Sequence, residues 1–300
     1  MTDALVRALL ASQNPDGGWG PATGQSSTTE LTALATLALG LVDRPVVRAR
    51  ASHGLRWLVE RQHPDGGWPV STRVSDGSWS TALAVLALDV LGHDMSSAVR
   101  GGRWLMRRSP REPGLLTHVL YRVAPGALPV RLNPDLKGWA WTSEASSFVE
   151  PTSYALLALK RLRHRMPERA VIDRIEEGER LVYDRMCHGG GWNYGNSTVL
   201  DVALWPYADV TALALLALRD RGEREANRRS LHALRGMLEH VSSGLSLAWA
   251  TLCFAAYGED PEPWRRRLLD RYGRTAFLDE RRAVALAVLA VTGGAEVFRT

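Results

Sequence analysis

The chain has 300 residues, 45% of them hydrophobic, which is enough for one large core or two ordinary domains. Its net charge is +5, but lysine occurs only at Lys137 and Lys160, and acidic residues are interspersed with the arginines throughout. This mixed charge is typical of a solvated surface and argues against a nucleic-acid partner.

The cysteine content and the hydropathy indicate the cellular compartment in which we expect the protein. Cys187 and Cys253 are the only cysteines, so we expect no disulfide framework, and the chain fits a reducing environment. No apolar run reaches the roughly 18 residues of a transmembrane helix. We therefore expect a cytoplasmic protein, which a hydrophobic substrate and a weak basic attraction to lipid phosphates would bring to a membrane surface as a peripheral protein.

Helices of two kinds are predicted to alternate along the chain. Amphipathic stretches rich in arginine and glutamate indicate outer helices, and stretches of alanine and leucine, apolar nearly all round, indicate inner helices. In chain order, outer before inner in each pair, they are 2–12 and 28–41, 48–62 and 79–91, 97–108 and 149–162, 168–186 and 208–220, 224–240 and 245–257, and 262–272 and 280–292. Such hairpins, each burying its stripe against its neighbours, predict an all-α fold, an (α/α)6 toroid, with no strands.

The loops of this toroid differ in length. Connections from an inner to the next outer helix are short, whereas the longest connections from outer to inner, about 109–148 and 187–207, hold much of the glycine, proline and tryptophan. Long loops at one end of a regular scaffold usually carry function, and the inner helices begin at that same end. We expect one domain over 1–300 with its site at this mouth. The 109–148 loop is a candidate lid or partner-docking arm.

Four inner helices share one register without gaps: ELTALATLAL from Glu30, WSTALAVLAL from Trp79, EPTSYALLAL from Glu150 and DVTALALLAL from Asp209. Equivalent places on a ring would bring the three carboxylates to one cavity, where mutual repulsion raises at least one pKa. The alternative for each acid is stabilisation of its own helix dipole, worth about 0.3–1 kcal/mol. That alternative carries most weight for Glu30 and least for Asp209.

Two heptapeptides recur, QNPDGGW at 13–19 and QHPDGGW at 62–68, with degenerate copies in LKGWAW at 136–141 and GGGW at 189–192. In each, Pro-Asp-Gly-Gly supplies a tight turn, flanked by glutamine and tryptophan. The pattern resembles the QW motif of squalene and oxidosqualene cyclases and of the wider prenyltransferase and squalene oxidase repeat family, over nearly the whole chain. The resemblance implies the toroid and a hydrophobic isoprenoid ligand, although this fold hosts several activities.

The cyclases of that family carry an Asp-x-Asp-Asp-Thr-Ala string whose middle aspartic acid protonates an alkene or epoxide. The equivalent string here is YADVTA, with Asp209 in the place of the proton donor and with Tyr207 and Val210 in place of the neighbouring carboxylates. The resemblance therefore implies metal-free, acid-initiated cyclisation or isomerisation without a cofactor. Asp209 would donate the proton, and Glu150 would be its partner or the terminating base.

Aromatic residues are the expected walls of a central cavity. The chain has eleven tryptophans and four phenylalanines, and cyclases resembling it use aromatic faces to stabilise carbocations. We expect Trp79, Trp141 and Trp249 to serve as such faces. Further candidate substrate contacts are Glu30, Trp192, Trp205 and Tyr207, and Arg282 is a candidate to hold a diphosphate.

Three functions remain open at this point. The leading one is the isoprenoid cyclase-like isomerase, and a second is a non-catalytic binding or carrier protein on the same toroid. The third is a transferase like the β subunit of protein prenyltransferases, which requires zinc. The inner-helix starts at Leu245 and Arg282 lack the acid, thiol and imidazole that bind this zinc, so we expect no metal. Because triterpene cyclases enclose substrate between two toroids, a second subunit or a homodimer would complete the chamber.

Overall fold

The computed structural model describes residues 1–74, 76–111, 114–124, 128, 130, 132–142 and 144–299. Most of the remaining residues fall in the predicted 109–148 loop, and that part of the prediction lies outside the described residues. Within the described ranges, no helix is both long enough and apolar enough to span a bilayer.

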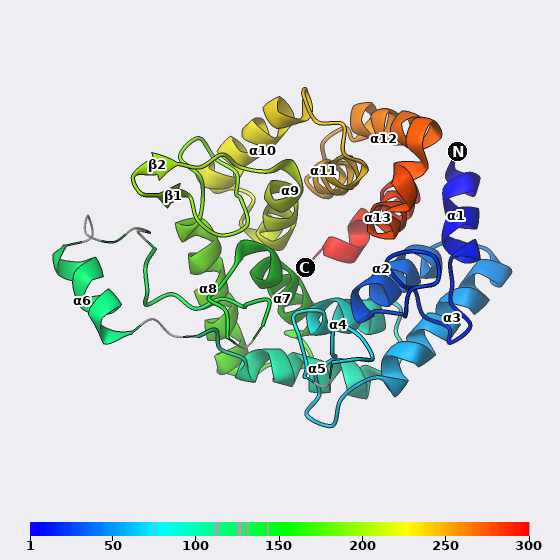
Figure 1. Cartoon of the computed structure of the whole chain (residues 1–300), viewed down its shortest axis with the longest axis horizontal. Helices are drawn as coiled ribbons and strands as arrows, with labels where there is room; N and C mark the ends of the chain where they lie inside the picture. Colours follow the sequence, from blue (N-terminus) through cyan, green and yellow to red (C-terminus); the bar gives the residue numbers. More distant parts are fainter. Residues whose placement is uncertain are drawn as a thin grey trace.

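Apolar helices form the inner layer of a closed ring (Figure 1). In the part of the chain that the structure describes, these are α2 (Thr29–Gly40), α4 (Thr81–Val90), α7 (Val149–Leu162), α9 (Ala208–Ala217), α11 (Gly244–Ala256) and α13 (Arg281–Val291). Each contacts the next, and α13 returns to α2, which closes the ring. Their alanine and leucine side chains are buried on nearly every side, as expected for helices enclosed between an outer layer and a core.

Amphipathic helices form the outer layer. They are α1 (Thr2–Ala11), α3 (Pro45–Glu60), α5 (Met95–Arg107), α8 (Arg169–Asp184), α10 (Glu225–Leu238) and α12 (Glu262–Thr275). Short 3₁₀ turns follow three of these helices: η2 (Arg219–Arg221) after α9, η3 (Ala276–Asp279) after α12 and η4 (Gly294–Phe298) after α13. The predicted all-α (α/α)6 toroid is confirmed, with helix ends within a few residues of the expected ones.

A repeated contact, here called the Trp–Thr latch, joins each long loop to its inner helix. The backbone N–H of a loop tryptophan donates to the hydroxyl of a first-turn threonine, and its indole N–H donates to a carbonyl near the end of the preceding outer helix. The latches are Trp19 with Thr32 and Leu9, Trp68 with Thr81 and Leu58, Trp139 with Thr152 and Leu105, and Trp192 with Thr211 and Val182. The donor–acceptor distances are 2.6–3.0 Å, so each latch satisfies buried polar groups.

Two elements depart from the prediction. The long 109–148 connection contains a helix, α6 (Leu115–Val123), and the 187–207 connection contains a two-stranded hairpin of β1 (Thr198–Val199) and β2 (Val202–Ala203). The hairpin turns at Leu200 and Asp201, which both have positive φ, a backbone conformation that the sequence pattern does not announce at non-glycine residues. The hairpin is too short for a clear periodicity, whereas α6 has Leu115, Leu116, Val119 and Val123 at helical spacing, a signal that the prediction missed.

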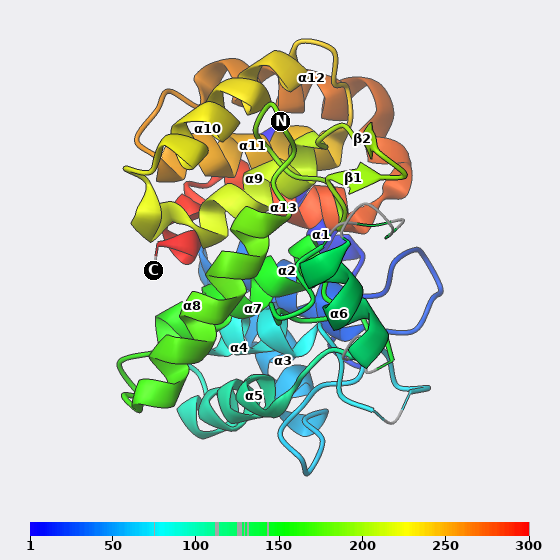
Figure 2. The same ribbon diagram turned by 90° about the vertical axis from the view of Figure 1, so that its left-hand side faces the viewer.

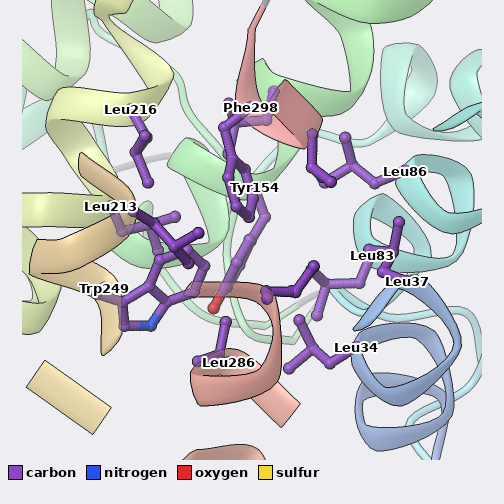
Figure 3. Close-up of a cluster of buried hydrophobic side chains, with 14 of the residues drawn as sticks. Leu34, Leu37, Leu83, Leu86, Tyr154, Leu213, Leu216, Trp249, Leu286 and Phe298 are labelled. Atoms are coloured by element: carbon purple, nitrogen blue, oxygen red, sulfur yellow. The ribbon is translucent and has the colours of Figure 1, made fainter. Parts of the chain in front are cut away.

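Side chains fill the middle of the ring where the sequence predicts a Trp-lined hollow. Tyr154, Trp249 and Phe298 meet there with a layer of leucines from the surrounding inner helices (Figure 3). Tyr154 and Phe298 are 0% exposed and Trp249 is 1% exposed. Phe298 belongs to η4, which closes the end of the ring away from the long loops (Figure 2).

Candidate active site at the mouth of the ring

The first turns of the inner helices bring ionisable side chains together at the long-loop end. α2 contributes Glu30, α7 contributes Glu150 and, one turn later, Tyr154, and α13 contributes Arg282. In ring order α13 and α7 lie opposite each other, with α2 and α4 on one side and α9 and α11 on the other. A contact between α13 and α7 side chains therefore crosses the mouth.

Arg282 makes that contact. Its Nη2 donates to Oε1 of Glu150 and, at 2.9 Å, to the hydroxyl of Tyr154. Its Nε lies 3.0 Å from Oε1 of Glu30. Burial acts to lower the pKa of the guanidinium, but Tyr154 and the two carboxylates hold that pKa well above its ordinary value. Because two carboxylates already face this one cation, its geometry argues against the diphosphate contact expected from the sequence.

Glu30 has the more unusual environment of the two acids. Burial raises its pKa, Arg282 lowers it, and the negative charges of Glu150 and Glu280 raise it, leaving the pKa above its ordinary value. Oε1 of Glu30 and Nε of Arg282 are both buried, yet neither forms a hydrogen bond with another described residue. Glu30 therefore retains its proton more readily than an ordinary glutamic acid, even though Arg282 lies beside it.

Aromatic rings run in contact from the mouth through the middle of the ring, and we call them the aromatic column. Trp141 meets the edge of Trp79 at a centroid distance of 4.8 Å, and Trp79 stacks on Tyr154 at 5.7 Å. Tyr154 contacts Trp249 at 6.2 Å, and Trp249 contacts Phe298 at 5.5 Å. Trp79 and Trp141 are half-buried, so only the mouth end of the column can meet a ligand. Burial raises the pKa of Tyr154 far above its ordinary range, so this hydroxyl stays protonated.

Asp209 lies on a separate part of the mouth. It is half-buried in the first turn of α9, and its Oδ2 accepts a hydrogen bond from the hydroxyl of Tyr194 at 3.2 Å. Burial, followed by the charges of Asp209 and Glu150, raises the pKa of Tyr194 to about 12. Arg282, Glu30, Glu150 and Tyr154 form one group of contacts, here called the Arg282 cluster. Tyr194 contacts Asp209 and is close enough for the charges of Glu150 and Arg282 to affect its pKa. Glu30 and Glu150 therefore share Arg282, whereas Asp209 lies apart from them.

A surface cleft begins at the outer side of Trp79. Its walls include Trp79, Trp104, Trp139 and Trp141, together with Pro110 and Pro151. Trp79 lines this tryptophan cleft and also stacks on Tyr154, so the cleft reaches the edge of the Arg282 cluster. Arg108 also lines the cleft, with its guanidinium 4.4 Å from the centroid of the Trp104 ring, so the remaining aromatic walls suit an apolar ligand.

The other aromatic residues predicted to contact substrate lie in different parts of the structure. Trp192 is fully buried in a Trp–Thr latch and takes a packing role because its indole N–H is committed to Val182. Trp205 is 84% exposed beside the β1–β2 hairpin, away from the Arg282 cluster. Tyr207 is exposed and contacts Tyr194 at a centroid distance of 5.5 Å. Trp249 lies inside the filled ring, below Tyr154.

Sequence reasoning missed Tyr154, Tyr194 and Phe298. Tyr154 could have been found, because it stands four residues after Glu150 and therefore on the same face of one helix. Tyr194 and Phe298 lie in a loop and a 3₁₀ turn, where no periodicity marks the direction of a side chain. Among the described residues, no group of three histidine, cysteine or acidic side chains gathers as metal ligands do.

Comparison with known proteins places the chain by its fold. No protein-family model and no curated protein matches its sequence. Among solved structures it resembles the type II terpene cyclase MstE from Scytonema, with a TM-score of 0.63 and 15% identity over 99% of this chain and 97% of that one. A variant of that enzyme in complex with geranylgeranyl dihydroxybenzoate, its substrate, matches with a TM-score of 0.62 and 14% identity over 99% and 96%.

An α-amylase from Clostridium perfringens is equally similar, with a TM-score of 0.65 and 10% identity over 97% of both chains. At these identities the likeness establishes the fold that the chain shares with a terpene cyclase and an amylase. The chemistry has to be argued from the side chains at the mouth.

Proposed function

We propose that this protein is a terpene cyclase-like isomerase that binds a hydrophobic isoprenoid at the mouth of the ring and rearranges it by metal-free acid catalysis. The Arg282 cluster carries the proposal. In it a glutamic acid with a raised pKa, Glu30, stands beside a fixed guanidinium and close to aromatic faces. This combination can hold a proton, release it, and stabilise the cation that results.

The proposed reaction begins with proton transfer from Glu30 to one carbon of a substrate alkene. The alkene π electrons form the new C–H bond and leave a carbocation on the other carbon. In cyclisation a second alkene of the same molecule attacks this cation, and in simple isomerisation no ring forms. Loss of a proton from a neighbouring carbon to the Asp209 carboxylate then restores a double bond. Asp209 releases this proton to water, and Glu30 takes up a proton from water before the next turnover. The product is an isomer of the substrate, so no co-reactant is consumed.

This assignment changes the roles expected from the sequence, in which Asp209 donates the proton and Glu150 assists. Asp209 accepts a hydrogen bond from Tyr194, and Glu150 is engaged by Arg282. Glu30 is the better donor, because burial keeps its proton in place and Arg282 stabilises the carboxylate left behind. Glu150 then acts by holding Arg282 across the mouth.

The tryptophan cleft is the proposed binding site of the isoprenoid chain. It offers apolar walls that end at Trp79 and Pro151, next to the Arg282 cluster, whereas the middle of the ring is filled. Trp79 and Trp141 would each stabilise a nearby cation by about 0.5–2 kcal/mol. The related enzyme from Scytonema has geranylgeranyl dihydroxybenzoate as its substrate, which supports testing long prenyl chains on aromatic heads.

A non-catalytic binding protein is the second candidate, and the filled ring favours it. Tyr154, Trp249 and Phe298 occupy the space in which a long substrate could fold inside a toroid. Such a protein would use the tryptophan cleft to hold an isoprenoid without turning it over. Saturable binding without product formation distinguishes this candidate from the isomerase.

The test is incubation of the protein in D₂O with geranyl, farnesyl and geranylgeranyl alcohols and with geranylgeranyl dihydroxybenzoate. Each turnover replaces one substrate proton by deuterium, so the isomerase yields products with a new chromatographic retention and a mass increased by one unit. We expect Glu30→Gln to lower the rate by about 10²–10⁴-fold, the usual contribution of a general acid. Glu144→Gln, which removes an exposed carboxylate near Trp141, is the matched control and should keep the wild-type rate.

Three outcomes are decisive. Unchanged turnover in Glu30→Gln together with loss in Asp209→Asn would return the donor role to Asp209. Binding of the same alcohols, followed by tryptophan fluorescence, without any deuterated product supports the binding protein. Cleavage of maltooligosaccharides, tested in parallel because of the likeness to an amylase, would contradict both candidates.

A further inference from the structure

A second cavity lies between the long 109–148 connection and the end of α8, and we call it the Arg185 cavity. Figure 1 shows this connection, with α6, to the left of α8. The volume of the cavity is about 190 Å³, and its apolar walls are Pro110, Val130, Leu132, Pro134 and Leu136. An apolar cavity of about 150 Å³ holds benzene, so this one has room for a small molecule with one aromatic ring.

Polar contacts hold two parts of the wall together. His118 and Arg122 of α6 contact the two oxygens of the Asp135 carboxylate at 2.9 Å and 3.3 Å. The backbone N–H of Asp135 donates to Oδ1 of Asn133 at 3.0 Å. These contacts tie α6 to the segment that provides most of the apolar wall, so the cavity is built by the fold of this connection.

Arg185 is the buried charge of the cavity. It directly follows the last residue of α8, and its side chain is 6% exposed. Its Nη1 is paired with the Asp184 carboxylate, whereas its Nε is buried and has no hydrogen-bond partner among the described residues. Burial lowers the pKa of this guanidinium, and Asp184 offsets part of that effect. A buried cationic N–H without an acceptor is unfavourable, so an oxygen of a ligand would stabilise it.

The other charges on the wall have the same sign. Arg111 and Lys137 line the cavity together with Arg185, and no acidic side chain lines it among the residues that the structure describes. The two acids nearest in the chain are engaged elsewhere, since Asp135 pairs with α6 and Asp184 with one nitrogen of Arg185. The electrostatic environment of the cavity therefore favours an anion over a neutral or cationic ligand.

We infer that the Arg185 cavity binds a small organic anion, with a carboxylate or phosphate group on Arg185 and an apolar body against Leu132 and Leu136. Guanidinium groups bind both kinds of oxyanion through charge-assisted hydrogen bonds. The apolar walls distinguish such a ligand from an inorganic ion, which would gain nothing from them. The inference is independent of the proposed reaction, because the walls of this cavity include no member of the Arg282 cluster.

The experiment is isothermal titration of the full chain with benzoate and with phenyl phosphate. Benzamide, which has the same shape as benzoate without its charge, and inorganic phosphate, which has no apolar body, are the matched ligands. We expect at least one aromatic anion to bind at least tenfold more tightly than both matched ligands. The tighter of the two anions identifies the oxyanion that the cavity prefers.

Two variants place the ligand in this cavity. Arg185→Gln should weaken binding of the aromatic anion at least tenfold, whereas Arg180→Gln, which removes an exposed arginine of the same helix, should keep the wild-type affinity. Leu132→Trp keeps Arg185 and fills the cavity, so it should weaken binding by at least as much. Pro110 lines both this cavity and the tryptophan cleft, but Leu132 lines only the cavity, so the second variant separates the two sites.

Melting temperatures of the variants establish that each one folds. If Arg185→Gln does not fold, Leu132→Trp decides alone. Absence of binding by both aromatic anions overturns the inference, as does undiminished affinity in a folded Arg185→Gln or Leu132→Trp variant. Equal affinity for benzamide would mean that only the apolar walls bind, and equal affinity for inorganic phosphate would mean that only the charge binds. Either result also overturns it.

Discussion

Arg282 organises the mouth of the ring because its guanidinium is shared by carboxylates from two other inner helices. Glu150 takes the aligned hydrogen bond, whereas Glu30 lies at 3.0 Å without one. Two acids in the same helical register therefore have different environments. Sequence register predicts that such side chains meet, but the exact partner of each depends on how far the side chain of Arg282 reaches across the ring.

The raised pKa of Glu30 makes the stability of the fold depend on pH. The folded-state pKa lies above the ordinary value of 4.5. The stability that protonated Glu30 contributes to the fold is therefore present below pH 4.5, and it is lost as pH rises through the folded-state pKa. We expect Glu30→Gln to remove this loss. As pH rises, the variant should become more stable than the wild type. The difference in the free energy of unfolding should reach about 1.4 kcal/mol for each unit by which the folded-state pKa of Glu30 exceeds its unfolded-state pKa.

Urea denaturation at a series of pH values between about 4 and 8 measures this difference. Glu144→Gln, a change of the same charge on an exposed residue, should run parallel to the wild type. A Glu30→Gln curve that also runs parallel to the wild type would mean that Glu30 titrates normally in the folded protein.

At the scale of elements, the Trp–Thr latch explains why a first-turn threonine recurs in the inner helices. In each latch the threonine hydroxyl accepts a backbone N–H that the loop would otherwise bury unpaired. The sequence register revealed the threonines, and the glycine-rich turns revealed the tryptophans. Their pairing became visible only when the loop was seen to fold back onto the helix that follows it.

Thr81→Val tests the latch, because valine keeps the shape of threonine and removes the acceptor for the Trp68 N–H at 2.8 Å. We expect a loss of about 1–3 kcal/mol in the free energy of unfolding, the penalty for a buried unpaired donor. Thr36→Val is the matched control, since the hydroxyl of Thr36 is buried on α2 and has no hydrogen-bond partner among the residues that the structure describes. That change should be neutral or stabilising. Equal losses of unfolding free energy in both variants would mean that the latch hydrogen bond does not stabilise the fold.

At the scale of the whole molecule, the ring is held from inside as well as around its circumference. η4 inserts Phe298 beneath Trp249, and Arg161 binds the carbonyls of Val297 and Arg299 while pairing with Asp89 of α4. These contacts join a segment near residue 298 to α4 and α7. The aromatic column is thereby closed at its far end, which leaves the mouth as its ligand-accessible end.

Phe298→Ala should convert this closed end into an apolar cavity. We expect a loss of about 3–5 kcal/mol in the free energy of unfolding, as for other buried phenylalanines. Benzene or xenon should bind the new cavity and raise the melting temperature, because an apolar cavity of this kind stays dry. Phe298→Leu should lose less unfolding free energy, and benzene should not raise its melting temperature. A loss below about 1 kcal/mol in Phe298→Ala would mean that the ring does not depend on this contact.

The fold could be predicted from the sequence because its signals are local. Apolar and amphipathic periodicities alternate along the chain, and each is confirmed as an inner or an outer helix. The candidate site was less predictable. Glu30, Glu150 and Asp209 were placed at the mouth by register. Tyr154, which contacts Arg282, and Tyr194, which contacts Asp209, carry no signal apart from the position of Tyr154 one turn after Glu150.

What the sequence determined by itself is the alternation of helices and the place of Glu30, Glu150 and Asp209 in the first turns of inner helices, because helical periodicity and turn chemistry depend on near neighbours in the chain. Only the tertiary structure decided that the middle of the ring is filled and that Arg282 spans the mouth from α13 to α7. Each of these results from side chains distant in sequence competing for one space. No local pattern encodes the outcome of that competition.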